Sequence, residues 1–144
     1  MARYSKGKRE VNCKVIYFGP AGAGKSTSLG TVERKAGRRN GDLTTVSSEA
    51  DHTLSFEYVQ LHIGRVQGLT TKMHLYSVPS RGRDIPARRT ILQGADAIIF
   101  VADSRPERME ANLNAQVELE EELRKQGAEE STPVVFQWNM RDAP

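Results

Sequence analysis

One octapeptide constrains this 144-residue chain more than any other feature. Residues 19–26, Gly-Pro-Ala-Gly-Ala-Gly-Lys-Ser, match the pattern G-x-x-x-x-G-K-[ST], in which a glycine-rich turn wraps around phosphate groups. The match follows an apolar, β-prone segment at 11–18 and opens a segment from about 24 to 35 that is predicted to be helical. This order suits a phosphate loop, because consecutive backbone N–H groups and the N-terminus of a helix favour an anion.

The residue types in the octapeptide fit particular roles in phosphate binding. Glycines let the backbone approach phosphate oxygens closely, Lys25 is expected to reach the terminal phosphates, and the Ser26 hydroxyl is expected to bind Mg²⁺. The alternative is a chance glycine-rich turn, and the preceding strand, the spacing, Lys25 and Ser26 together argue against it. The sequence therefore predicts nucleotide contacts along the segment, from Ala21, Gly22, Ala23, Gly24, Lys25, Ser26 and Thr27.

Strand-like and helix-like segments alternate along the rest of the chain, which is typical of an α/β fold. Residues 54–63 and 71–78 are predicted to form a β-hairpin around a turn at 64–68, which would supply one antiparallel edge to a mostly parallel sheet. The apolar segment 97–102 is predicted to be a central strand covered on both faces, and 133–138 a second buried strand. Helices are expected at 87–94 and from Pro106 to Gly127, with loops at 36–48 and 79–86.

Composition excludes several classes of protein. One cysteine cannot build a disulfide framework. Residues 1–10 are polar and no apolar run approaches the ~20 residues that span a bilayer, so a reduced, cytoplasmic protein without an integral membrane segment is expected. Residues 1–41 hold ten Lys and Arg against two Glu, which suits a phosphate-bearing ligand, an acidic partner or a solvated surface. Aromatic residues make up 6% of the chain and do not suggest a nucleic-acid surface.

A second motif, Asn139-Met140-Arg141-Asp142, directly follows the predicted strand at 133–138. It resembles the N-K-x-D guanine motif of small GTPases. The Asp142 carboxylate would accept hydrogen bonds from guanine N1–H and the 2-amino group, and adenine has no matching donors. Asn139 would hold the phosphate loop and the base. Met140 replaces the usual lysine and can supply its apolar contact without its charge.

The chain as a whole resembles the Ras-like small GTPases, and within them the MglA family of bacterial gliding-motility GTPases. The resemblance covers nearly the whole chain, and the segments that carry it lie at 10–20, 52–58, 73–79, 91–104 and 107–113. The resemblance implies a Ras-like P-loop fold and a single G domain over 1–144. That domain would be truncated at its C-terminus, because the family's guanine-contacting loop, last strand and last helix would come after it.

The same resemblance implies a molecular switch that binds GTP or GDP with Mg²⁺, acts in cell polarity or gliding motility and hydrolyses GTP. It implies a Roadblock-type activating partner and polarity effectors. Thr53 lies where the family has the switch threonine that binds Mg²⁺ and senses the γ-phosphate, although a threonine without a ligand role could also begin a strand there. Ser77-Val78-Pro79-Ser80 occupies the position of the D-x-x-G motif.

Four departures from the family pattern predict slow hydrolysis with nucleotide binding retained. Ala21 and Ser80 stand where the family has glycine, Arg81 replaces the glutamine that orients water, and His52 replaces an internal arginine finger. A finger can contribute ~10³–10⁵ in rate. The residues expected to take part in catalysis are Lys25, Thr53 and Arg81. Arg81 either substitutes for a finger, as Arg83, Arg88 or Arg89 could, or belongs to a solvated basic loop or a partner-binding face.

Two other functions stay open on the sequence. The first is a nucleotide-binding interaction module, a pseudo-GTPase with little or no hydrolysis. The second is a P-loop ATPase or kinase, against which Asn139 and Asp142 argue. Four further residues are given structural roles: Asp103 as a helix cap, His62 and His74 as packing or surface residues of the hairpin, and Cys13 as a small core residue.

Overall fold

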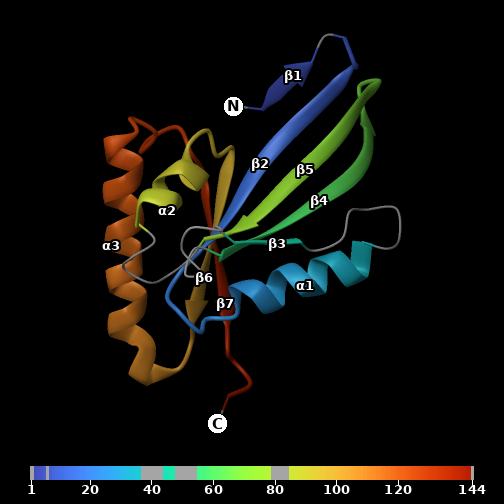
Figure 1. Ribbon diagram of the computed structural model, residues 1–144. Coiled ribbons are helices and arrows are strands. Elements are labelled where there is room, and N and C mark those ends of the chain that lie inside the picture. Colours follow the sequence, from blue (N-terminus) through green and yellow to red (C-terminus); the bar gives the residue numbers. More distant parts are fainter. Residues whose placement is uncertain (1, 6, 37–43, 48–54, 79–84, 144) are drawn as a thin grey trace.

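The computed structural model describes residues 2–5, 7–36, 44–47, 55–78 and 85–143. It contains one mixed sheet with helices on both faces (Figure 1). The strands follow the order β3-β4-β5-β2-β6-β7, and β1 pairs with β2 outside this path. Their bounds are β1 Arg3–Ser5, β2 Glu10–Phe18, β3 Thr44–Ser47, β4 Ser55–Val66, β5 Leu69–Ser77, β6 Ala97–Asp103 and β7 Val134–Asn139.

Four neighbouring strands, β5, β2, β6 and β7, run in the same direction. The strand β2 is parallel to β5 on one side and to β6 on the other, and β6 is parallel to β7. The pairs β3–β4 and β4–β5 are antiparallel, as is β1–β2. The predicted fold class, an α/β fold with a mostly parallel sheet and an antiparallel edge, is confirmed. The carboxyl ends of β2, β6 and β7 therefore meet at one edge of the sheet.

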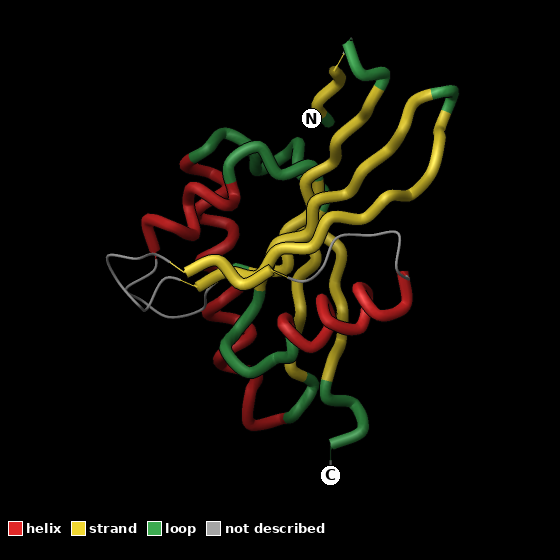
Figure 2. Tube along the Cα trace, turned by 45° about the vertical axis from the view of Figure 1, so that its right-hand side comes forward, coloured by secondary structure: helices red, strands yellow, loops and turns green. Residues whose placement is uncertain are grey.

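The helices divide the core into two layers, one on each face of the sheet (Figure 2). The helix α1, Lys25–Ala36, covers one face, where Leu29 packs with Val15, Tyr17 and Val101 of the sheet. The helices α2, Ile85–Leu92, and α3, Met109–Lys125, cover the other face, where a short 3₁₀ turn at Pro106–Arg108 leads into α3. Alternate residues of β2 and β6 contribute to the two layers, as the period of two along a strand requires.

Two strands lie outside the sequence prediction. The strand β3, Thr44–Ser47, falls inside the predicted loop at 36–48, and β1, Arg3–Ser5, falls in a segment that was given no element. Both are short and pair antiparallel with a longer strand, β4 and β2 respectively. Their conformation is set by the partner strand, because such short segments carry too little periodicity to indicate a strand by themselves.

The hairpin is longer and tighter than the sequence predicts. Its strands continue to Val66 and resume at Leu69, so the turn holds only Gln67 and Gly68. Both turn residues have positive φ, at 51° and 77°, as a two-residue turn that matches the twist of the strands requires. The predicted turn at 64–68 is wrong because the strand continues through Gly64, where the register shifts at a bulge.

The strand β7 is not the buried strand that the sequence predicts. It lies at the edge of the sheet, and Val135, Phe136 and Trp138 are 60%, 45% and 60% exposed. An apolar strand sequence indicates burial only if other elements cover both faces. Within the described residues, β7 has only β6 as a strand neighbour.

Two side chains with expected structural roles have the following surroundings. His74 lies in the hairpin, where its imidazole stacks on Tyr58. Its Nε2 donates to Asn12 Oδ1 at 2.7 Å, so Nδ1 of the neutral ring accepts from Tyr58 Oη at 2.5 Å. Cys13 is half-buried, and burial raises the pKa of its thiol.

Among the described helices, none is long and apolar enough to cross a membrane.

Candidate functional site

The octapeptide forms the turn between the carboxyl end of β2 and the first residue of α1 (Figure 1). Two of its glycines are required by close contacts. Gly19 and Gly24 have φ of 149° and 97°, in the region that favours glycine. A Cβ on Gly19 would collide with the carbonyl of Val101, and a Cβ on Gly24 would lie 2.9 Å from Asn139 Nδ2. The loop therefore packs against the ends of β6 and β7.

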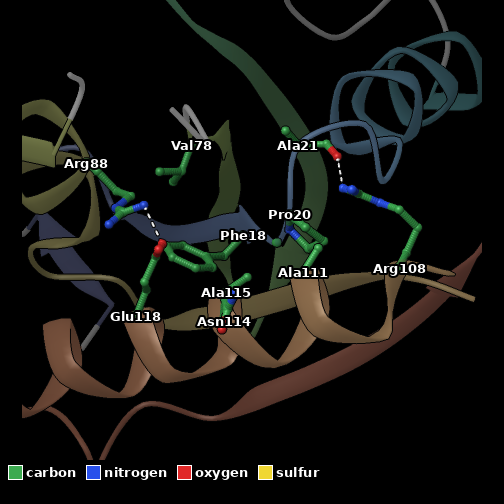
Figure 3. A pocket seen from close by; sticks show the side chains of 11 residues that line it. Phe18, Pro20, Ala21, Val78, Arg88, Arg108, Ala111, Asn114, Ala115 and Glu118 are labelled. Carbon is green, nitrogen blue, oxygen red and sulfur yellow. Dashed lines mark hydrogen bonds and ion pairs between the residues drawn. The ribbon is translucent and has the colours of Figure 1, made fainter. Parts of the chain in front are cut away.

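Side chains from three elements hold the carbonyl groups of this loop. Lys25 Nζ donates to Gly19 O at 2.7 Å and Pro20 O at 2.9 Å. Arg108 Nη2 donates to Ala21 O at 2.6 Å (Figure 3), and Asn139 Nδ2 donates to Ala23 O at 3.0 Å. Because C=O and N–H of a trans peptide point in opposite directions, the bonds from Arg108 and Asn139 at Ala21 O and Ala23 O direct the N–H groups that follow these two carbonyls to the opposite side. That arrangement is suited to an anion.

Lys25 is the buried cation of the loop, with only 8% of the residue exposed. Burial lowers the pKa of its ammonium group to about 8, and the positive charge of Arg88 adds to the effect. A phosphate group in the loop would reverse this, because a nearby negative charge favours the protonated form. Lys25 is therefore placed to respond to the charge of a ligand.

The second motif reaches the loop from the end of β7. Both the side chain and the backbone of Asn139 are hydrogen-bonded. Its Oδ1 accepts from Gln137 Nε2 at 2.8 Å, and its backbone O accepts from Ser104 N at 2.9 Å. Met140 follows in the left-handed region, with φ of 60°. The exposed Asp142 comes two residues later. The structure thus brings residues 139–140 against the phosphate loop, 116 residues away in sequence from Ala23.

The other predicted site residues divide into two groups. Ser26 and Thr27 are exposed at the start of α1, where hydroxyl oxygens suit a hard cation such as Mg²⁺. Thr53 and Arg81 lie outside the described residues, as do His52, Ser80 and Arg83. Among the residues that the structure does describe, no three His, Cys, Asp or Glu side chains gather into a metal site.

Two basic residues that could replace the finger, Arg88 and Arg89, form ion pairs with carboxylates of α3. Arg88 is 6% exposed, donates to Glu118 Oε2 at 2.9 Å and lies 5.4 Å from the centre of the Phe18 ring. Arg89 Nε donates to both carboxylate oxygens of Glu122 at 3.1 Å. The interpretation as a solvated residue is therefore wrong for Arg88, which is buried. The Arg89 side chain stays 51% exposed while it pairs with Glu122.

Asp103 is the centre of an ion-pair cluster and not a helix cap. Its side chain is fully buried, Arg105 binds it through two nitrogens at 2.9 and 2.5 Å, and Arg108 Nε lies 3.4 Å from Oδ2. The 3₁₀ turn begins after Arg105 without a side-chain cap. The hydrogen bonds and charges of Arg105, with the charge of Arg108, hold the pKa of Asp103 at about 2.

Sequence reasoning missed Arg108. A cavity of about 240 Å³ lies between the phosphate loop and α3, and Arg88 and Arg108 approach it from opposite sides (Figure 3). Arg108 belongs to the short turn before α3 and contacts the loop across 87 residues of sequence. No spacing rule connects the two, and only the parallel order of β2 and β6 brings them together.

Comparison with known proteins finds a relative that matches most of the chain. The chain is 42% identical over 138 residues to the mutual gliding-motility protein MglA of Myxococcus xanthus (strain DK1622). The match covers 94% of the chain and 71% of that protein. No model of a protein family matches the chain.

The contact between Gly24 and Asn139 predicts the effect of adding one methyl group. Gly24→Ala is expected to lower the free energy of unfolding by about 1–3 kcal/mol, because it combines a positive φ with a short contact to Asn139. Gly30→Ala is the matched control, since its Cβ would meet nothing within 4 Å. Because Gly30 lies in the interior of α1, Gly30→Ala is expected to raise the free energy of unfolding by about 0.5–1 kcal/mol. Urea denaturation of both variants measures this, and equal effects would contradict the packing described.

The lowered pKa of Lys25 predicts proton uptake when a phosphate ligand binds. At pH 8.5 an ammonium group with a pKa of about 8 is mostly neutral. Bound GDP, the ligand that the motifs predict, should raise this pKa, so binding takes up roughly 0.7 proton at pH 8.5 and about 0.1 at pH 7. Calorimetry in buffers of different ionisation enthalpy gives this number.

Lys14→Met provides the control for this measurement. Burial also lowers the pKa of Lys14, but its Nζ donates to Gln93 O and not to the loop. The variant should therefore keep the proton uptake of the wild type. Binding without uptake at pH 8.5 would show that Lys25 does not sense the phosphates.

Proposed function

Because the chain belongs to the MglA family of Ras-like small GTPases, we propose that it is a GTP-binding molecular switch that hydrolyses GTP to GDP slowly. The observation that supports this most is the joining of the two nucleotide motifs. Asn139 of the second motif donates to Ala23 O of the phosphate loop, and Lys25 lies buried within that loop. A base site and a phosphate site at such a junction suit one nucleotide.

Each part of the nucleotide has proposed partners in this chain. The backbone from Ala21 to Thr27 binds the phosphates, and Lys25 neutralises their charge. The hydroxyl of Ser26, with that of Thr53, holds Mg²⁺, which when bound supplies further neutralisation of phosphate charge. Asp142 selects guanine, and Asn139 connects the base to the loop.

The proposed reaction is an in-line attack of water on the γ-phosphorus of GTP. A bond forms between the water oxygen and phosphorus, the bond from phosphorus to the β–γ bridging oxygen breaks, and the products are GDP and inorganic phosphate. Negative charge develops on the bridging oxygen, and the Lys25 ammonium group stabilises it. Arg81 is the proposed residue beside the attacking water, where its cation could also stabilise charge.

The alternative is a nucleotide-dependent interaction module with little or no hydrolysis. Ala21 favours it, because this exposed residue of the loop carries a methyl group where the family has glycine. A Roadblock-type activating protein and polarity effectors are the proposed partners in either case, in the cytoplasm. The name of the relative refers to gliding motility, and we propose a related role in motility or polarity here, with residues 1–144 forming one G domain.

Single-turnover hydrolysis of GTP separates the two functions. If the protein is a switch, it should release phosphate slowly by itself and faster when a Roadblock-type partner is added. If it is an interaction module, it should bind GTP tightly without phosphate release under either condition. A protein that binds GTP and stays inactive with the partner would overturn the enzyme assignment.

The role of Asp142 gives a test of base selection. Asp142→Asn is expected to weaken GDP binding and to favour xanthosine diphosphate, because the amide offers a donor where xanthine presents an oxygen. Loss of one such charged pair should cost roughly tenfold or more in affinity. Competition binding with GDP and xanthosine diphosphate measures the ratio of the two affinities in the wild type and in the variant. A variant that still prefers GDP would place the base elsewhere.

The departures from the family pattern predict a series of gains in rate. Arg81→Gln and His52→Arg should each raise kcat, and the double variant should raise it further, because water positioning and a finger act in the transition state. KM should change little. If Arg81→Gln lowers kcat instead, then Arg81 supplies charge to the reaction, and the assignment of a lost glutamine is wrong.

A further inference from the structure

We propose that Arg108 is a positioning residue of the phosphate loop: its guanidinium group, held by Asp103, fixes the Ala21 carbonyl outward and so aims the Gly22 amide at the phosphates. The proposal rests on the proposed function, since it concerns the same nucleotide site. It adds a residue that neither motif contains.

The first step of the argument is the contact itself. Arg108 Nη2 donates to Ala21 O at 2.6 Å (Figure 3). Hydrogen bonds from a charged donor are shorter and roughly twice as strong as neutral ones. The contact joins the turn before α3 to the middle of the loop, at the residue that precedes Gly22.

The second step is the anchoring of Arg108. Its Nε lies 3.4 Å from Asp103 Oδ2, and the Asp103 side chain is fully buried at the end of β6. The backbone of Asp103 is itself tied to Asn112 of α3, through Asp103 N to Asn112 Oδ1 at 3.0 Å and Asn112 Nδ2 to Asp103 O at 2.8 Å. The guanidinium group is therefore held between a fixed carboxylate and the loop.

The third step is the conformational freedom of the loop at this point. Gly22 has φ of 77°, and a Cβ there would meet nothing within 4 Å. The turn bond from Ala23 N to Pro20 O at 3.3 Å spans the Ala21–Gly22 peptide, and the central peptide of such a turn can rotate without breaking that bond. The hydrogen bond at Ala21 O opposes this rotation. A rotated peptide would turn a carbonyl oxygen toward the phosphates in place of an N–H group, which anions disfavour.

The fourth step is the effect on phosphate binding. In a trans peptide the N–H of Gly22 points opposite to the C=O of Ala21, so a donor outside the loop fixes a donor inside it. Hydrogen bonding to the carbonyl also polarises the peptide and strengthens its N–H as a donor. The Ala21–Gly22 peptide lies in the loop ahead of α1, which begins at Lys25, and we expect it to serve the outer phosphates more than the one next to the sugar.

The chain offers a matched control in Arg105. Arg105 also binds the Asp103 carboxylate, through two nitrogens, but the hydrogen bond to Ala21 O comes from Arg108. Arg105→Ala and Arg108→Ala each remove one guanidinium group from the same carboxylate. Only the second should release the loop.

The experiment measures GDP and GMP affinities of the wild type and both variants by calorimetry. Arg108→Ala should weaken GDP binding by about tenfold to a hundredfold and GMP binding much less, and Arg108→Lys should recover part of the loss. Arg105→Ala should leave both affinities near those of the wild type. Equal losses for GDP and GMP, unchanged GDP affinity in Arg108→Ala, or an equal effect of Arg105→Ala would each overturn the proposal.

A second measurement does not depend on nucleotide. The amide resonance of Gly22 in the nucleotide-free protein should shift and broaden in Arg108→Ala and stay in place in Arg105→Ala, because only the first frees the peptide. If the Gly22 resonance does not move in Arg108→Ala, the proposed restraint of the Ala21–Gly22 peptide by Arg108 is wrong. Absence of GDP binding by the wild type would instead overturn the proposed function, and the amide result would still decide the role of Arg108.

Discussion

The site depends on one constraint: carbonyl groups of the phosphate loop must be held away from the ligand. Ala21 O is held by Arg108, in the 3₁₀ turn that follows β6, and Ala23 O is held by Asn139, the last residue of β7. Neither donor is near the loop in sequence. They reach it because β2, β6 and β7 are parallel neighbours whose carboxyl ends share one edge. The order of the sheet thus determines which side chains can orient the loop.

Electrostatics make the same edge receptive to a polyanion. Lys25 is buried with the positive charge of Arg88 near it, and both lower its affinity for a proton. Arg88 is stabilised by Glu118 and by the face of Phe18, and Lys25 Nζ donates to two backbone carbonyls of the loop. A ligand phosphate would add negative charge beside Lys25, and the attraction between the two charges favours binding.

The part of the fold that sequence could predict is the part with local signals. The strand β2, the loop and α1 follow from an apolar run, a glycine-rich motif and a helix-forming segment, and the contact of Asn139 follows from a motif after a strand. The remainder depends on pairing and distance. Thr44–Ser47 is a strand because β4 lies beside it, Trp138 is exposed because β7 lies at an edge, and Arg108 reaches Ala21 only through the order of the sheet. Asp103 was misread as a cap because its two arginine partners are evident only in three dimensions.

The central claim is that this edge of the sheet forms one guanine-nucleotide site, with a phosphate loop and a base selector joined by Asn139. The most direct test is displacement of a fluorescent GDP analogue from the wild-type protein by unlabelled GDP and by ADP at equal concentrations. The account predicts displacement by GDP at concentrations at least about a hundredfold below those needed for ADP, because only guanine offers the two donors that Asp142 accepts. Equal displacement by the two nucleotides would contradict it.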